Sequence, residues 1–131
     1  MSRRLFSFGY DACHRWAVLR LAGFTIDECG SIQELRERLM RSNFMGSHSV
    51  EAVIMVEDIL VLPPEAIVAA RSYFTGPVVL FEGRTPTSHG DAFDLRVPVL
   101  TRPEVWLPQI DKLSETIRYR PTGEAVHSKV L

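Results

Sequence analysis

Carboxylates directly follow the most apolar run of the chain. Ala52 to Val56 are five consecutive apolar residues, and Glu57 and Asp58 come immediately after them. A short continuous apolar run is typical of a strand that is buried on both faces, as in a parallel sheet. Binding sites in open parallel sheets lie at the carboxyl ends of the strands. Glu57 and Asp58 therefore stand where acid chemistry or cation binding would take place.

Two further acids, Asp11 and Glu82, follow the first and fourth predicted strands. A cluster of Asp11, Glu57 and Glu82 would be a new kind of cation site. Repulsion among the three carboxylates would otherwise raise their affinity for protons or attract a counter-ion such as Arg102. The same residues have a simpler interpretation, in which Asp11 caps a helix while Glu57 and Asp58 are solvated loop acids. The sequence leaves both interpretations open.

Segments with strand and helix patterns alternate along the chain. Alternation requires crossover connections, which predicts a mostly parallel five-stranded sheet between layers of helices, a three-layer α/β sandwich. Asp11 and Gly23 bound the first helix, whose inner stripe is predicted at Val18, Leu21 and Ala22. The predicted strands cover 5–8, 24–29, 52–56, 77–81 and 95–97, and the predicted helices cover 12–22, 31–41, 63–76 and 103–113.

Length and charge limit the classes of function. A chain of 131 residues with 46% hydrophobic composition predicts one domain, which we place at 1–118, followed by a flexible tail at 119–131. Fifteen basic and sixteen acidic side chains leave a net charge of -1, so no field recruits nucleic acid or an anionic membrane. The absence of a long apolar segment argues against a signal peptide or membrane span, and we expect a cytoplasmic protein.

Other chemistry-bearing residues carry weaker signals. Cys13, His14 and Cys29 would converge near one sheet edge, but a closed zinc site normally needs four ligands, so two core cysteines in a reducing compartment are the simpler interpretation. The segment from Gly9 to His14 lacks the glycine spacing of a dinucleotide-binding loop. Trp106 is expected in the core, or as an interface anchor if it is exposed.

Five segments in order resemble the receiver domain of two-component response regulators, over 4–117. The resemblance implies a flavodoxin-like fold with strand order 2-1-3-4-5 and a role in signalling. The family's fourth helix would be short or absent here, because 84–90 has a loop composition. The segments are Leu5–Phe8, Leu19–Phe24, Glu51–Val56, Pro77–Phe81 and the proline after the fifth strand.

The residues that run the reaction of that family are missing. The family holds magnesium with acids after the first strand, accepts a phosphoryl group on an aspartate that ends the third, and places a hydroxyl and a lysine after the fourth and fifth. These groups offset the charge on the transferring oxygens. In this chain, Gly9 and Tyr10 stand at the positions of the magnesium-binding acids, with Asp11 nearby, and Val56 or Glu57 stands at the position of the acceptor. Glu82 stands at the position of the hydroxyl, and Val97 or Arg102 at that of the lysine.

The resemblance therefore implies a degenerate receiver. We expect a module without enzymatic activity or cofactor that acts through an unidentified protein partner, which includes a second copy of itself. Glu57 would at most imitate the charge of a phosphorylated aspartate. The alternatives are a phosphoacceptor that uses Asp58 or Glu57 with Mg²⁺, in which Asp11 and Glu57 are the metal ligands, and a small ligand-binding α/β protein.

Overall fold

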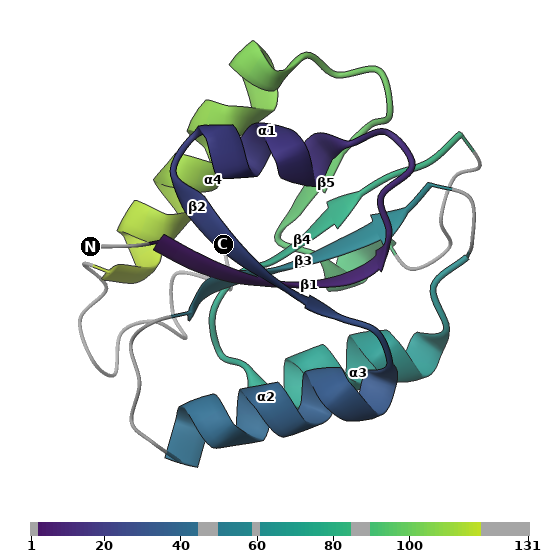
Figure 1. Ribbon diagram of the computed structural model, residues 1–131, viewed down its shortest axis with the longest axis vertical. Coiled ribbons are helices and arrows are strands. Elements are labelled where there is room, and N and C mark those ends of the chain that lie inside the picture. Colours follow the sequence, from purple (N-terminus) through teal and green to yellow (C-terminus); the bar gives the residue numbers. More distant parts are fainter. Residues whose placement is uncertain (1–2, 45–49, 59–60, 85–89, 119–131) are drawn as a thin grey trace.

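The computed structural model describes residues 3–44, 50–58, 61–84 and 90–118 (Figure 1). The predicted tail at 119–131 lies outside the described residues. The strands are β1 (Arg3–Tyr10), β2 (Phe24–Cys29), β3 (Val50–Glu57), β4 (Val78–Phe81) and β5 (Leu95–Val97). The α-helices are α1 (Arg15–Leu21), α2 (Ile32–Phe44), α3 (Pro64–Tyr73) and α4 (Pro103–Arg118).

The five strands form one parallel sheet in the order β2-β1-β3-β4-β5. Helices α1 and α4 cover one face of the sheet, and α2 and α3 cover the other (Figure 1). This confirms the predicted three-layer α/β sandwich and its strand order. Gly9 pairs with Val56 and Tyr10 with Glu57, so β1 and β3 end side by side. We call the side of the sheet where its strands end the carboxyl edge.

The connection between β4 and β5 differs from the other crossovers. Within its described part it contains only a short 3₁₀ helix, Gly90–Ala92, in agreement with the expected short or absent helix. Residues 85–89 of the predicted loop lie outside the described residues. The helix labelled α4 comes after β5.

The core has two parts because β3 is buried on both faces. Ile54 and Val56 point towards α1 and α4, while Val53 and Met55 point towards α2 and α3. This burial agrees with the interpretation of the apolar run as a strand covered on both sides. Within the described residues, no helix is both long and apolar enough to cross a bilayer.

Trp106 belongs to the core under α4. Its side chain is 1% exposed, and its ring centroid lies 5.0 Å from that of Phe81 on β4. A side chain so fully covered has no surface to offer a partner. This corrects the interface role considered for Trp106.

Helix α1 is shorter than predicted and turned differently. It begins at Arg15, after His14 adopts a left-handed conformation with φ 59°. Its buried residues are Arg15, Trp16 and Leu19, whereas Leu21 of the predicted stripe is almost fully exposed. The apolar pattern of so short a helix did not determine its rotation, which decides what faces the carboxyl edge.

Candidate functional site

The carboxyl edge is closely packed where β1 meets β3. Gly9 has φ +112°, and a Cβ placed there would lie 2.4 Å from the carbonyl oxygen of Val56. Glycine is the residue that accepts this backbone conformation without strain. The neighbouring Tyr10 is exposed, and Val56 is buried without any group that could accept a phosphoryl transfer.

The guanidinium of Arg15 fills the centre of this edge. Nη2 forms an ion pair with Asp58 after β3 and donates to the carbonyl oxygen of Glu82 after β4 at 3.0 Å. Nη1 donates to the carbonyl oxygen of Val97 at the end of β5, at 3.3 Å. The guanidinium carbon also lies 4.8 Å from the ring centroid of Phe81. One cation from α1 therefore joins the ends of three strands.

Both oxygens of the Asp58 carboxylate are engaged. Oδ1 pairs with Arg15, and Oδ2 accepts the backbone N–H of Cys13 at 3.0 Å. The side chains of Arg15 and Asp58 are 6% and 2% exposed. A buried charge is tolerated when an opposite charge and hydrogen bonds compensate for lost hydration. Asp58 is thus a buried, paired carboxylate and not a solvated loop acid. We refer to this pair as the Arg15–Asp58 bridge.

Asp11 holds α1 in the position that delivers Arg15. Its Oδ1 accepts the backbone N–H of Arg15 at 3.0 Å, and its Oδ2 accepts that of Trp16 at 2.7 Å. Unpaired N–H groups of a first helical turn are commonly satisfied by a carboxylate in this way. Of the two interpretations of Asp11, the structure supports the helix cap.

The three acids proposed as a cation cluster are used separately. Oε2 of the buried Glu57 accepts the N–H of Leu62 at 2.9 Å, on the connection to α3. The Glu82 carboxylate pairs with Arg96 of β5, whose Nε lies 2.9 Å away. With Asp11 used as a cap, each acid has its own partner, and the shared cation cluster that the sequence left open is not formed.

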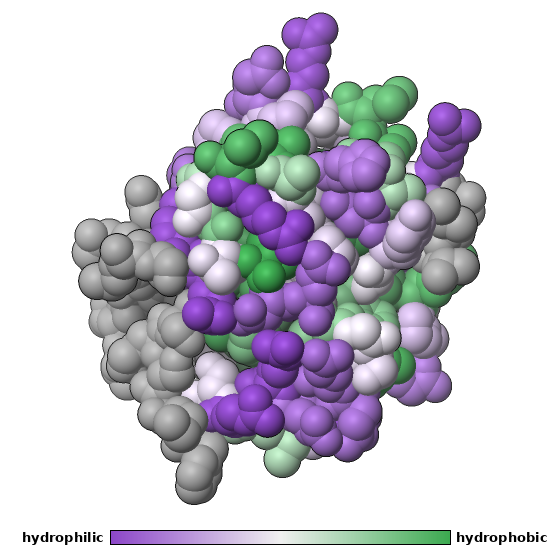
Figure 2. Space-filling model, viewed as in Figure 1, coloured by the Kyte–Doolittle hydropathy of each residue, from purple (hydrophilic) through white to green (hydrophobic). Residues whose placement is uncertain are grey.

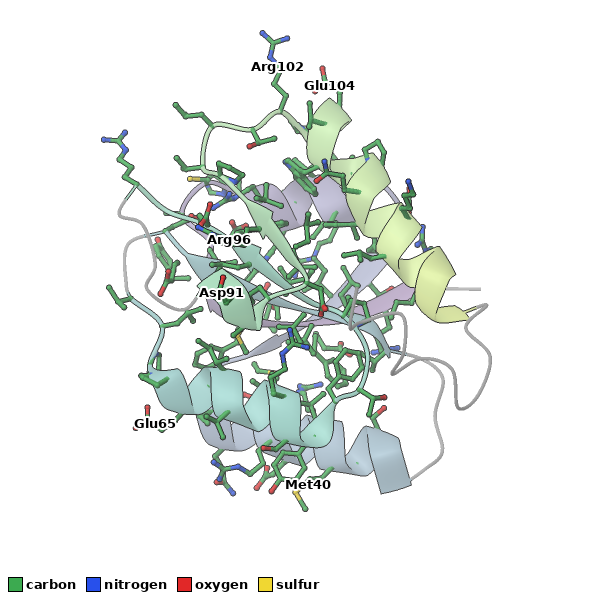
Figure 3. The ribbon with its side chains drawn as sticks, turned by 180° about the vertical axis from the view of Figure 1, so that it is seen from behind. Met40, Glu65, Asp91, Arg96, Arg102 and Glu104 are labelled. Atoms are coloured by element: carbon green, nitrogen blue, oxygen red, sulfur yellow. The ribbon has the colours of Figure 1, made fainter. Side chains whose placement is uncertain are left out.

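Arg102 is not the counter-ion of these acids. Figure 3 shows its side chain extending away from the body of the protein, and Arg102 is exposed. The cations that meet the edge acids are Arg15 and Arg96. Val97 contributes its backbone, because its carbonyl oxygen accepts from Arg15 and from the N–H of Glu82 at 2.8 Å.

The two cysteines lie in different environments. Cys29 ends β2 and is buried, and burial raises the pKa of its thiol to about 11. Cys13 is exposed; partial desolvation and then the negative charge of Asp58 raise its pKa. In the described part of the chain, no three His, Cys, Asp or Glu side chains are grouped so that they could hold a metal ion. This includes the trio of Cys13, His14 and Cys29.

Sequence reasoning missed Arg15, the central residue of the edge. It lies four positions after Asp11, and only the rotation of α1 turns it inward. One signal was present, because the sequence gathers carboxylates at this edge with no lysine beside them, and such a group favours another cation nearby. A residue in the first turn of a helix that begins at this edge can bring such a cation close to the carboxylates.

Comparisons with known proteins bear on the fold. No family model matches the chain, and no curated protein matches it. Among solved structures, it is similar to the receiver domain of the hybrid histidine kinase CckA, with a TM-score of 0.59 and 15% identity over 85% of this chain and 98% of that one.

Two further solved structures have the same architecture. The N-terminal domain of a response regulator/sensory box/GGDEF protein from Carboxydothermus hydrogenoformans matches with a TM-score of 0.62 and 10% identity, over 88% of this chain and 96% of that one. A 3-dehydroquinate dehydratase-like protein from Bifidobacterium longum matches with a TM-score of 0.56 and 8% identity, over 89% and 98%. At such identities the likeness establishes the receiver-type, flavodoxin-like fold, which hosts different functions.

Proposed function

We propose that this chain is a degenerate receiver-like signalling module that acts by binding protein and not by accepting a phosphoryl group. The Arg15–Asp58 bridge is the observation that carries the proposal. The receiver fold supports a role in signalling, and the bridge lies at the edge where a receiver would perform its chemistry.

In the bridge, the guanidinium of Arg15, which is covalently part of the chain, occupies the place that an exchangeable metal ion would take beside the carboxylate. Phosphoryl transfer to a carboxylate requires a free oxygen and cations that can approach the incoming group. Both Asp58 oxygens are occupied, and the guanidinium is held by two carbonyl oxygens in addition to the carboxylate. An arginine remains charged at any physiological pH. The positive charge that Arg15 places at this edge is therefore constant.

The alternative of a magnesium-dependent acceptor has one point in its favour, since Asp58 follows β3 directly. The ligands it needs are engaged elsewhere, because Asp11 caps α1 and Glu57 binds the N–H of Leu62. A cytoplasmic location forms part of our proposal and is supported by two free cysteines, which suit a reducing compartment.

The test is incubation with Mg²⁺ and acetyl phosphate, followed by intact mass measurement at neutral pH. A receiver domain with a complete acceptor pocket, treated in parallel, verifies the phosphodonor. Because acyl phosphates hydrolyse, beryllofluoride with Mg²⁺ serves as a second probe, read by thermal shift. We expect neither an adduct nor a shift. An adduct on the wild-type chain that is lost in Asp58→Asn would overturn the proposal.

A further inference from the structure

The outer surface of the α2–α3 layer carries a groove with a volume of about 460 Å³. Arg36 of α2 lines one side, and Glu65, Val68, Ser72 and Tyr73 of α3 are among the residues of the other. The groove lies on the face of the molecule opposite to α1 and α4. It does not involve the Arg15–Asp58 bridge.

An exposed apolar side chain, Val68, lines the groove and is 62% exposed. Met40, one helical turn beyond Arg36 and outside the lining of the groove, is 48% exposed. Figure 3 shows Met40 and Glu65 pointing away from the sheet on α2 and α3. By contrast, the side of α2 that faces the viewer in Figure 2 is mostly hydrophilic. Within this layer, exposed apolar side chains therefore accompany the groove.

The groove also carries one charge of each sign that forms no ion pair within the described part of the chain. Among the described residues, the guanidinium of Arg36 contacts only Oε1 of Gln33, at 3.5 Å. Neither Arg36 nor Glu65 takes part in an ion pair with another described residue. The two charges stand on different helices and line the same groove as Val68. They are available to an external partner.

We infer that a second copy of this chain binds this groove, in a twofold dimer. A twofold interface must be complementary to itself, and this groove offers one charge of each sign together with the exposed apolar side chain of Val68. In such a dimer, Arg36 of one copy faces Glu65 of the other, and the two Val68 side chains meet near the axis. A groove with charge of one sign would instead require a different partner. The inference rests on the proposed function, because it names the surface through which the module makes protein contacts.

The experiment is sedimentation of the purified chain and its variants up to millimolar concentration. Arg36→Glu and Glu65→Arg each place like charges at both contacts, and we expect each to weaken self-association about tenfold or more. Val68→Glu buries charge at the axis and abolishes association. Mixing the Arg36→Glu and Glu65→Arg variants restores opposite charges at both contacts and restores association, as does the double variant.

Matched controls lie on the other side of the protein. Glu104 follows a proline at the start of α4 as Glu65 does at the start of α3, and Arg102 is an exposed arginine nearby (Figure 3). Glu104→Arg and Arg102→Glu leave association unchanged. A wild-type chain that is monomeric at millimolar concentration, or a dimer insensitive to the groove variants, overturns the inference. Neither result bears on phosphoryl transfer, which the mass measurement reads separately.

Discussion

Two arginines join strands at opposite edges of the same sheet, with different surroundings. Arg3 at the amino edge pairs with Glu51 at 3.0 Å and Asp111 at 2.6 Å and lies 4.3 Å from the ring centroid of Phe24. Arg15 at the carboxyl edge likewise has a carboxylate and an aromatic ring. The side chains of Arg3 and Asp111 are 31% and 48% exposed, whereas the Arg15–Asp58 bridge is almost fully covered.

This difference in burial determines how much each arginine contributes. Burial alone would lower the pKa of Arg3, but its bonds to Glu51 and Asp111 outweigh that effect and raise it. Exposed pairs contribute little to stability because water and salt screen them. A buried pair is different, because removing one partner leaves the other charge uncompensated. The same chemical group is therefore a partly exposed contact at one edge and a structural requirement at the other.

The largest effect is expected from Arg15→Met. Loss of the guanidinium leaves the Asp58 carboxylate buried without a counter-charge, which lowers the free energy of unfolding by about 3–5 kcal/mol. Urea denaturation, followed by the fluorescence of the buried tryptophans, measures this change. The double variant Arg15→Met/Asp58→Asn regains a large part of the loss, since it leaves no charge unpaired. If Arg15→Met were as stable as the wild type, the buried arginine would contribute no more to stability than the partly exposed Arg3.

The next effect concerns glycines near the two edges. Gly9 at the carboxyl edge and Gly23 after α1 have similar positive φ angles, +112° and +104°, but only Gly9 lacks space for a Cβ. Gly23→Ala costs about 1–3 kcal/mol through backbone strain alone. Gly9→Ala adds the clash with the Val56 carbonyl and costs at least about 1 kcal/mol more. Equal losses in urea denaturation would contradict this ranking.

A pH dependence is expected from Cys29, a second buried group at the carboxyl edge. Its thiol pKa rises from 9.0 to about 11 in the folded state, so the unfolded chain loses this proton first. Stability is therefore fully present below pH 9 and falls by up to about 2 kcal/mol as the pH approaches 11. Comparison with Cys29→Ala across this range isolates the contribution, because other titrations cancel. Parallel curves for the two proteins would disprove it.

The smallest effect is expected from Arg3→Met. Its partners retain contact with water, so we expect a loss of about 1 kcal/mol or less. The loss shrinks further in high salt, which screens an exposed pair more than a buried one. Urea denaturation at low and high salt, with Arg15→Met in parallel, checks both statements. A loss as large as that of Arg15→Met would show that burial does not separate the two arginines.

The fold could be predicted further than the site. The five apolar runs, with helical segments between all but the last two, predicted a parallel sheet, because parallel strands are joined by crossovers and the Ala52–Val56 run needs cover on both faces. The sequence predicted where in the sheet the site lies but not which side chains pair with one another there. Glu57, Asp58 and Glu82 do stand at the carboxyl edge, yet their bonds to Leu62, Arg15 and Arg96 depend on side-chain directions that residue order does not contain.

By itself, the sequence determined which elements form, which edge gathers the acids and that no lysine stands beside them. Only the tertiary structure decided which cations pair with those acids. The seven residues of α1 are too few for their apolar pattern to fix its rotation. The Asp11 cap and the packing of Trp16 and Leu19 fix it instead and turn Arg15 onto Asp58. Such a pairing joins residues 43 positions apart, which only the folded chain brings together.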